Sequence, residues 1–354
     1  MREALHRLSA TALRLAALSA AIGCAASVAR ADSVEDFYRG KTITMYIGTG
    51  SGAGAVTGYP EAIAQIIPKY IPGKPNVVVT YMPGAGGIKA ANYIYGVAPQ
   101  DGTAWGFITR GFVLAPLLKL NGVQFNPVKF NWIGSPARAV SVGELYNANT
   151  TARSIEDATK TEVVLGATAP NQDTAVFPRA LNALVGTKFK IITGYESSPR
   201  IDIAMQQKEV QGKVGVTWTS LNSGSTANWI RDKVVNVIVQ LGTAKESYIP
   251  SDVPLALDLA KTPADRQALY VLCAPTAMGY PSFMGPGVPA ERIDAIRKAY
   301  AQVLQDPDFK AMTAKEQLDI DPISWTELTD LVRNIYGLPD DAVAQASAII
   351  NQAN

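Results

Sequence analysis

Glycines recur at alternate positions in the stretch Ile47–Ile67, where Gly48, Gly50, Gly52 and Gly54 precede an amphipathic segment. A backbone with so few side chains can turn tightly or approach another group closely. The N–H groups at the start of a helix carry partial positive charge and bind anions. The spacing therefore predicts a backbone site for a carboxylate or a phosphate, and it disfavours a cation.

A second glycine turn, Pro83-Gly84-Ala85-Gly86-Gly87, follows the next predicted strand and precedes a second predicted helix. Loops that follow parallel strands meet at the carboxyl edge of the sheet, where ligands of such sheets bind. The two turns are therefore expected to direct their amides toward the same small volume.

Other uses of the first glycine loop are open. Gly48, Gly50 and Ala53 satisfy a G-x-G-x-x-A dinucleotide pattern, but a lone match is weak and the strand Val77–Tyr81 ends without an acidic residue. The triplet Gly40-Lys41-Thr42 is typical of a P-loop, yet it precedes the strand instead of following it. A purely structural turn is the remaining alternative, and the second glycine turn weakens it.

Two charged residues are candidates for ligand contacts. Arg110 follows a predicted strand and could hold a carboxylate with two hydrogen bonds, or form an ion pair at the surface or between domains. Asp173 lies at the start of a predicted helix, in the segment Thr168–Thr174, and could contact a ligand or cap the helix. Both alternatives stay open for both residues.

Strand and helix patterns alternate in two blocks, which predicts an α/β fold with mainly parallel sheets flanked by helices. The segment Phe130–Ala139 is expected to cross between the blocks, and a second crossing is expected near Thr243–Val253. The predicted strands are 42–47, 77–81, 104–109, 162–167, 189–193, 213–217 and 234–240, and the predicted helices begin near Tyr59 and Gly87, cover Thr174–Val185 and Pro199–Lys208, and include Trp229.

The first 31 residues read as a secretory leader, because a basic start and an apolar run end at Ala29-Arg30-Ala31. A lipid-modified Cys24 is a minor alternative. The leader holds four arginines and one glutamate, so its removal changes the net charge from +2 to −1 and leaves no basic field for nucleic acid. It also holds His6, the only histidine, so histidine-based catalysis and histidine metal sites are excluded. Cys273 is then the sole cysteine and is expected to be a buried apolar residue.

Several ordered motifs make the chain resemble the substrate-binding proteins of tripartite tricarboxylate transporters, also called Bug-type periplasmic receptors. These motifs span the mature chain: Lys41-Thr42-Ile43, the glycine loop, Val77-Val78-Val79, Met82–Gly87, Ala91-Asn92-Tyr93, Ala98–Thr103, Asp252-Val253-Pro254 and Pro286–Ala290. The resemblance implies a two-domain clamp of the Venus flytrap type that closes over a small organic acid.

The resemblance also implies which residues hold the ligand, with the glycine turns in one wall and the loop near Asp173 in the other. The ligand-binding residues expected on this basis, together with Arg110, are Gly52, Ala53, Gly54, Ala55, Thr57, Gly84, Ala85, Gly86, Gly87, Thr168, Asn171, Gln172, Asp173, Thr174, Tyr195 and Thr219. Members of the family commonly have an aspartate near Thr57. Its absence here makes the expected site less negative, and Thr57 is expected to cap the helix instead.

We expect a signal peptide at 1–31, a discontinuous first domain at 32–133 and 243–354, and a second domain at 134–242. The expected function is that of a monomeric periplasmic receptor, without catalytic residues, cofactor or metal, that delivers a carboxylate to membrane permease subunits. The alternatives are a ligand-presenting subunit for a membrane sensor and an extracytoplasmic enzyme. Dicarboxylates, tricarboxylates, acidic amino acids and aromatic acids are all open as ligands.

Cleavage after Ala31 predicts a mature protein that begins at Asp32, because small residues occupy Ala29 and Ala31. Intact-mass measurement of the secreted protein checks this. A mass that corresponds to a lipid-modified Cys24 would contradict it and would imply attachment to a membrane.

Overall fold

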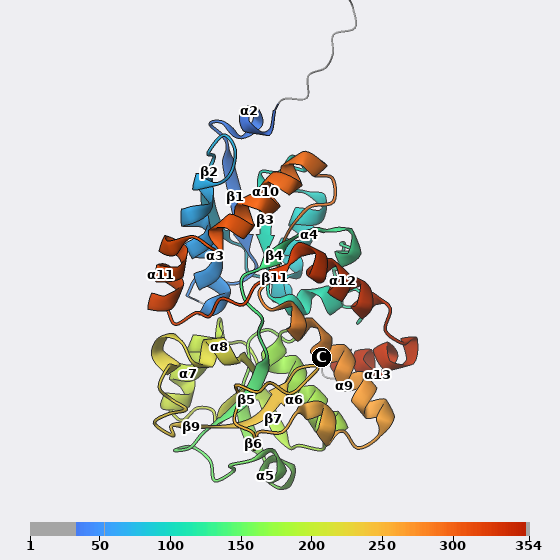
Figure 1. The fold of residues 1–354 in the computed structure, drawn as a ribbon. Helices are drawn as coiled ribbons and strands as arrows, with labels where there is room; N and C mark the ends of the chain where they lie inside the picture. Colours follow the sequence, from blue (N-terminus) through green and yellow to red (C-terminus); the bar gives the residue numbers. More distant parts are fainter. Residues whose placement is uncertain (1–32, 53, 352–354) are drawn as a thin grey trace, which may run out of the picture.

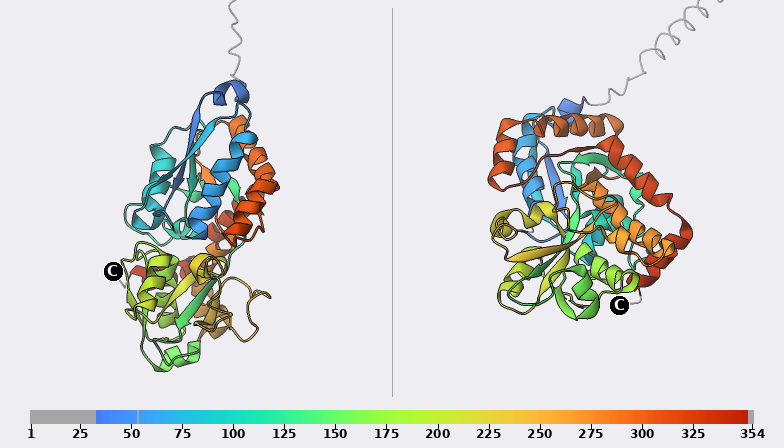
Figure 2. Two further views of the ribbon diagram at one scale, coloured as in Figure 1. Left: turned by 90° about the vertical axis from the view of Figure 1, so that its left-hand side faces the viewer. Right: turned by 60° about the horizontal axis from the view of Figure 1, so that its bottom comes forward.

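The structure is a computed structural model that describes residues 33–52 and 54–351. The predicted leader, Cys24 and Ala53 lie outside these described residues. The strands form two separate sheets, which define two lobes stacked one above the other (Figures 1 and 2). Within the described residues, no helix combines the length and the apolar character that crossing a membrane requires.

Lobe 1 is built on a six-stranded sheet and lobe 2 on a five-stranded sheet. The strand order in lobe 1 is β11-β4-β10-β3-β1-β2, with β1 (Thr42–Ile47), β2 (Asn76–Tyr81), β3 (Ala104–Phe107), β4 (Asn131–Ser135), β10 (Ser282–Met284) and β11 (Ile323–Ser324). The order in lobe 2 is β7-β6-β8-β5-β9, with β5 (Ser141–Tyr146), β6 (Val163–Gly166), β7 (Phe189–Ile192), β8 (Gly212–Thr217) and β9 (Val235–Leu241). The α-helices are α2 (Val34–Tyr38), α3 (Ala55–Ile66), α4 (Ile88–Gly96), α5 (Ile155–Lys160), α6 (Asp173–Leu184), α7 (Ser198–Gln206), α8 (Trp218–Leu221), α9 (Pro263–Cys273), α10 (Ala290–Val303), α11 (Pro307–Lys315), α12 (Trp325–Tyr336) and α13 (Asp340–Asn351).

The two-lobed clamp is confirmed, but the prediction of mainly parallel sheets is wrong, because both sheets are mixed. β1 pairs in parallel with β2 and β3, and β6 pairs in parallel with β7 and β8. The strands β4, β10 and β11 add antiparallel pairs in lobe 1, and β5 adds antiparallel pairs with β8 and β9 in lobe 2. The segment expected only to cross between the lobes contains β4, and β5 follows it directly.

The alternation of side chains along β1 sets the layers of lobe 1. Ile43, Met45 and Ile47 are buried and pack in one core cluster with α3, α10 and α11, while Tyr46 packs against the cluster on the other face, which includes α4 and α12. Successive side chains of a strand point to opposite faces, so helices cover both faces of this sheet.

Helix α3 begins earlier than predicted, at Ala55 instead of near Tyr59. Pro60 therefore lies inside the helix, where it cannot donate to the carbonyl of Val56, and not in the first turn. Gly54, at φ 63°, occupies the N-cap position. Thr57 lies within the helix, and its hydroxyl donates to the Gly54 carbonyl at 3.2 Å, so the predicted capping role of Thr57 is wrong.

The prediction of a helix around Trp229 is also wrong. This segment contains only a short 3-10 turn at Gly224–Thr226, followed by hydrogen-bonded turns that reach β9. Trp229 itself is buried in the core of lobe 2, next to Tyr146. The serine and glycine residues around it favour turns.

The lobes share an apolar core near the segments that connect them. A single cluster of buried residues joins Phe112 and Phe283 of lobe 1 to Leu181 and Leu269 on helices α6 and α9. Helix α9 packs against α6, and the C-terminal helix α13 packs against both. The domain division at residues 133 and 242 stays a prediction. The chain passes from the lobe 1 sheet to the lobe 2 sheet between residues 135 and 141, and it returns between residues 241 and 282. Helix α9, which lies in the returning segment, packs with lobe 2.

Lobe 2 contains a buried group of three charged side chains. Glu144 on β5 is the cross-strand neighbour of Lys213 on β8, whose Nζ lies 3.3 Å from a Glu144 carboxylate oxygen. The same ammonium donates to Asp202 and, at 2.8 Å, to the Ser198 hydroxyl. Burial raises the pKa of Glu144 to about 7, with Asp202 acting in the same direction and Lys213 against it.

This raised pKa predicts that stability falls as the pH rises between about 4.5 and 7. In that window the folded state keeps a proton on Glu144 that the unfolded chain has released, so each step up in pH favours unfolding. Urea unfolding at pH 5 and pH 7 measures the decrease, which Glu144→Gln is expected to reduce.

The matched control is Glu291→Gln, which removes an exposed carboxylate from the first turn of α10. It is expected to leave the pH dependence of the unfolding free energy as it is in the parent protein. Equal pH dependence in the parent protein and Glu144→Gln would contradict the assignment to Glu144.

Candidate functional site

The parallel register of β1, β2 and β3 brings three loops together at one edge of the lobe 1 sheet. Ile47 pairs with Tyr81 and with Phe107, so the three strands end side by side. The first glycine loop, the Pro83–Gly87 turn and the Thr109–Arg110 segment follow these ends. This edge faces the other lobe, as the sequence pattern predicts for a ligand site.

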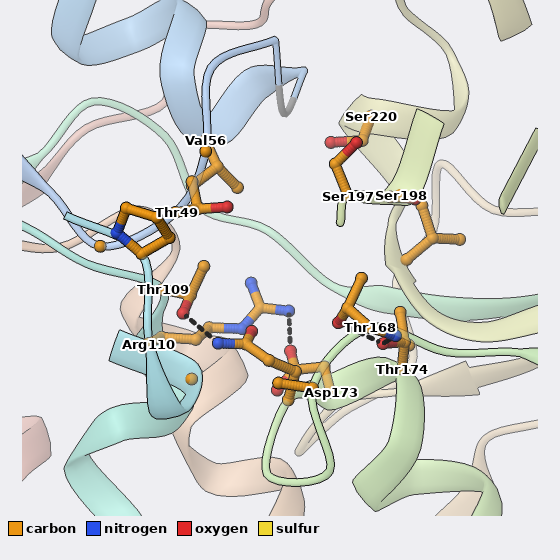
Figure 3. A pocket seen from close by; sticks show the side chains of 18 of the residues that line it. Thr49, Val56, Thr109, Arg110, Thr168, Asp173, Thr174, Ser197, Ser198 and Ser220 are labelled. Carbon is orange, nitrogen blue, oxygen red and sulfur yellow. Dashed lines mark hydrogen bonds and ion pairs between the residues drawn. The ribbon is translucent and has the colours of Figure 1, made fainter. Parts of the chain in front are cut away.

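A cavity of about 240 Å³ lies between these loops and lobe 2 (Figure 3). Lobe 2 contributes the loops after β6 and β7 and the carboxyl end of β8. The predicted residues that line the cavity are Gly84, Ala85, Gly86, Arg110, Thr168, Gln172, Asp173, Thr174 and Tyr195. From the first glycine loop, the lining residues are Gly48, Thr49 and Gly50.

Other predicted residues lie around this cavity instead of lining it. Gly52, Gly54 and Thr57 line a neighbouring cavity between the lobes, which shares Ser198 and Ser220 with the first. The remaining predicted residues are buried or lie beside the cavity: Ala55, Gly87 and Thr219 are buried, and Asn171 contacts the second glycine turn.

The second glycine turn has an unusual backbone. Gly84, Ala85, Gly86 and Gly87 all have positive φ, at 145°, 46°, 61° and 92°. Glycine adopts such values without strain, whereas Ala85 adopts them at a cost. The Gly87 N–H donates to the Gly84 carbonyl at 3.0 Å and closes the turn. The turn thus presents main-chain atoms, with only one methyl side chain among these four residues, to the cavity and to lobe 2.

Arg110 is buried, with 4% of its side chain exposed, and it links several parts of the chain. Its guanidinium donates to the Ala139 carbonyl at 3.2 Å and to the Ser141 hydroxyl at 2.6 Å. It also donates to Asp173 of lobe 2 at 3.3 Å, which makes it an ion pair between the lobes. Its Nε has no hydrogen-bond partner among the described residues.

Asp173 is the first residue of α6, and Gln172 holds the N-cap position without a side-chain cap. One quarter of the Asp173 side chain is exposed, 25%, so it is more accessible than its partner Arg110. Burial raises the pKa of Asp173, while the Arg110 guanidinium and the Ser141 hydroxyl oppose this shift. The start of a helix also favours a negative charge. Among residues 33–52 and 54–351, no cluster of three or more His, Cys, Asp or Glu side chains is arranged to hold a metal ion.

Several hydroxyl side chains also line the cavity, and sequence reasoning missed most of them. The Thr168 and Thr174 hydroxyls lie 2.8 Å apart and form part of the lobe 2 wall (Figure 3). The lining hydroxyl residues that were not predicted are Thr49, Thr109, Ser197, Ser198, Thr217, Ser220 and Tyr280. Thr217 caps α8 by accepting from the Ser220 N–H, which places both on one side of the turn and leaves Thr219 buried. Thr217 and Ser220 are three residues apart, a spacing that brings side chains together at a helical turn. This spacing was the signal in the sequence that could have identified them.

Besides the Arg110–Asp173 ion pair, further hydrogen bonds join the lobes across the cavity. Asn171 of lobe 2 donates to the Ala85 carbonyl at 2.8 Å, and Gln172 donates to the Thr109 hydroxyl at 3.1 Å. The hydroxyls of Thr217 and Tyr280 lie 2.8 Å apart. The structure therefore has the lobes in contact beside the cavity.

Solved structures of similar fold include the periplasmic binding protein BugD and two proteins solved with carboxylates. BugD shares 17% identity over 89% of this chain and 98% of its own, with a TM-score of 0.64. MatC from Rhodopseudomonas palustris, solved with malate, shares 14% identity over 86% and 99%, also with a TM-score of 0.64. A second R. palustris protein, solved with adipate, shares 15% identity over 87% and 97%, with the same TM-score.

The chain has the fold of the Bug-type periplasmic receptors. The resemblance predicted from the glycine turns and their flanking motifs is thus confirmed at the level of the fold, over nearly the whole length of these structures. Comparison with family models and with curated protein sequences finds no match. The assignment of individual binding residues therefore stays a prediction based on the geometry of the cavity.

Gly86→Val is expected to weaken binding of the small molecule that co-purifies with the protein by at least tenfold, on the order of 1.4 kcal/mol. A side chain at Gly86, where φ is 61°, would overlap the Asn171 amide of lobe 2. The substitution would therefore displace Asn171 and break its hydrogen bond to Ala85 between the lobes, while neither core is touched. Titration calorimetry measures affinity, and urea unfolding of the ligand-free protein measures stability.

Gly40→Val is the matched control, because Gly40 also has positive φ, 70°, but no atom lies within 4 Å of an added Cβ. It carries the same kind of backbone strain far from the cleft, so it is expected to retain normal affinity. If Gly86→Val bound normally but unfolded much more easily, Gly86 would be a structural turn only.

Proposed function

We propose that this protein is an extracytoplasmic solute-binding protein that captures a small organic carboxylate between its lobes and delivers it to a tripartite tricarboxylate-type membrane transporter. The observation that carries the proposal is the cavity between the lobes, in which two glycine-rich loops of lobe 1 face serine and threonine side chains of lobe 2. The periplasmic receptors of the same fold support the location and the role.

The residues around the cavity favour a carboxylate as the bound group. Main-chain N–H groups of glycine turns and hydroxyl groups donate hydrogen bonds to anions, and Arg110 adds a buried positive charge. Hydrogen bonds to a charged group contribute on the order of 1.5–3 kcal/mol each. Two receptors of the same fold were solved with malate and adipate, which are carboxylates.

Contacts between the lobes give the closure that such a receptor needs. Residues from both lobes contribute to the cavity wall, so a ligand inside it touches both lobes at once. A ligand stabilises the conformation to which it binds more tightly. Binding is therefore expected to favour the closed arrangement, which a membrane transporter could distinguish from the open one.

A carboxylic acid ligand is expected to raise the melting temperature, whereas its methyl ester is not. Esterification removes the negative charge that the glycine turns and Arg110 would bind. Ligand at about a hundredfold excess over Kd should add roughly 2.7 kcal/mol to the free energy of unfolding. The probe is the acid that mass spectrometry identifies in protein purified from its host, and the measurement is thermal unfolding by calorimetry.

Equal stabilisation by the acid and its ester would contradict the anion site. Delivery to a transporter is tested separately, by measuring uptake of the same acid in cells that lack either this protein or the permease. Uptake that continues without this protein would contradict a role in transport.

A further inference from the structure

The C-terminal helix α13 connects the two lobes a third time. Helix α12, which precedes it, lies in lobe 1, where it packs against β4 and where its last residue, Tyr336, donates to the Val113 carbonyl at 3.1 Å. Helix α13 packs instead against α6 and α9, which lie with lobe 2 (Figure 1). The chain therefore crosses between the lobes at residues 337–339, in addition to the two segments that lead to and from the lobe 2 sheet.

Apolar packing anchors α13 to lobe 2. Its buried residues Ala342, Ala346 and Ile350 are at most 3% exposed and belong to the same core cluster as buried residues of α6 and α9. Gln345 also donates to Asp265 of α9 at 2.9 Å. Because the burial of apolar surface is the dominant favourable contribution to folding, we expect α13 to stay with lobe 2 when the lobes move apart.

Two polar contacts hold α13 to lobe 1. The Ser347 hydroxyl and the Asn351 side-chain amide both donate to the Leu118 carbonyl, each at 3.0 Å. Leu118 follows the 3-10 turn Arg110–Leu114, so these bonds end on the segment of lobe 1 that carries Arg110. Hydrogen bonds between neutral groups contribute only about 1 kcal/mol each, so they break more easily than the apolar packing on lobe 2.

The link between α12 and α13 limits how far the lobes can separate at this place. It consists of Gly337, Leu338 and Pro339. Three residues of fully extended chain span about 10 Å at most. On the other side of the cleft, a cavity of about 580 Å³ lies between α3 and α11 of lobe 1 and α7 and the turn after α8 of lobe 2 (Figure 1). The two sides of the cleft are therefore built differently.

We propose that α13 is a strap between the lobes, so that the clamp opens on the side of α8 and α11 and only as far as the Gly337–Pro339 link allows. The link is then a third hinge, and the hydrogen bonds to Leu118 break as the lobes separate. This inference rests on the proposed function in one respect, because a ligand that contacts both lobes enters and leaves when they separate.

The experiment measures the distance between the lobes in the secreted protein after bound small molecules have been removed. Lys315→Cys on α11 and Ser225→Cys after α8 replace two exposed residues that line the larger cavity from opposite lobes. Spin labels on these two cysteines report their separation by double electron–electron resonance, and the buried Cys273 is inaccessible to the label. The strap is lengthened by inserting Gly-Ser-Gly-Ser between Leu338 and Pro339, which extends the link by up to about 13 Å.

The lengthened protein is expected to open further than the parent protein. The mean distance between the labels should increase by about 5 Å or more, within the length that the insertion adds. The matched control carries the same insertion between Lys208 and Glu209, in an exposed turn of lobe 2 that follows α7. It is expected to give the distance distribution of the parent protein.

A second variant tests the strap without changing the length of the chain. Ser347→Ala combined with Asn351→Ala removes both hydrogen bonds to Leu118 and leaves the apolar face of α13 intact. It should shift the distribution in the same direction, and it decides the question if the lengthened protein does not fold, as checked by urea unfolding.

An unchanged distribution in the lengthened protein, or an equal shift in the control, would overturn the inference. Neither result depends on a bound acid. The comparison of the acid with its methyl ester therefore still decides the proposed function, whichever way the strap experiment turns out.

Discussion

A buried guanidinium must keep its partners, and this requirement organises the cleft. Arg110 lies almost out of solvent and is held by the Ala139 carbonyl, the Ser141 hydroxyl and the Asp173 carboxylate. An arginine without them would cost several kcal/mol in that environment. The end of β3, the segment that crosses between the lobes and the start of α6 therefore have to meet at one place. The stacked rings of Phe112 and Phe283, 5.1 Å apart, hold the segment after Arg110 against the shared core.

The contacts that close the cleft are of a different kind, because they are few and polar. The hydrogen bonds that Asn171 and Gln172 make to lobe 1 involve neutral groups, and such bonds contribute about 1 kcal/mol each. The positive φ of Gly86 permits one of them, since a side chain there would displace Asn171. A closure held so weakly can be shifted by the differential affinity of a small ligand. The contacts of the buried Arg110 are thus the rigid part of the site, and the hydrogen bonds of Asn171 and Gln172 are the part that can adjust.

The sequence was a good guide where local patterns decide the structure. β1 begins and ends as predicted, and the glycine turns and the loop before α6 face the cleft. Patterns of neighbouring residues could not reveal contacts between distant segments. β4 lies in a region that looked like a simple crossing, and β5 directly after it was not predicted, since antiparallel return strands depend on partners far along the chain. For the same reason an ion pair was only one of the alternatives for Arg110, its partner Asp173 was not foreseen, and Tyr280 was not a candidate at all.

Each wall of the cavity is held by a buried cation. Arg110 fixes the lobe 1 side, and Lys213 fixes the lobe 2 side through its hydrogen bond to Ser198, which lines the cavity at the start of α7. Lys213 is in turn paired with Asp202, and its Nζ lies 3.3 Å from Glu144. Side chains held in this way lose little further freedom when a ligand arrives, and ordering side chains is a main cost of binding. Most of the binding free energy can then serve to bring the two lobes together.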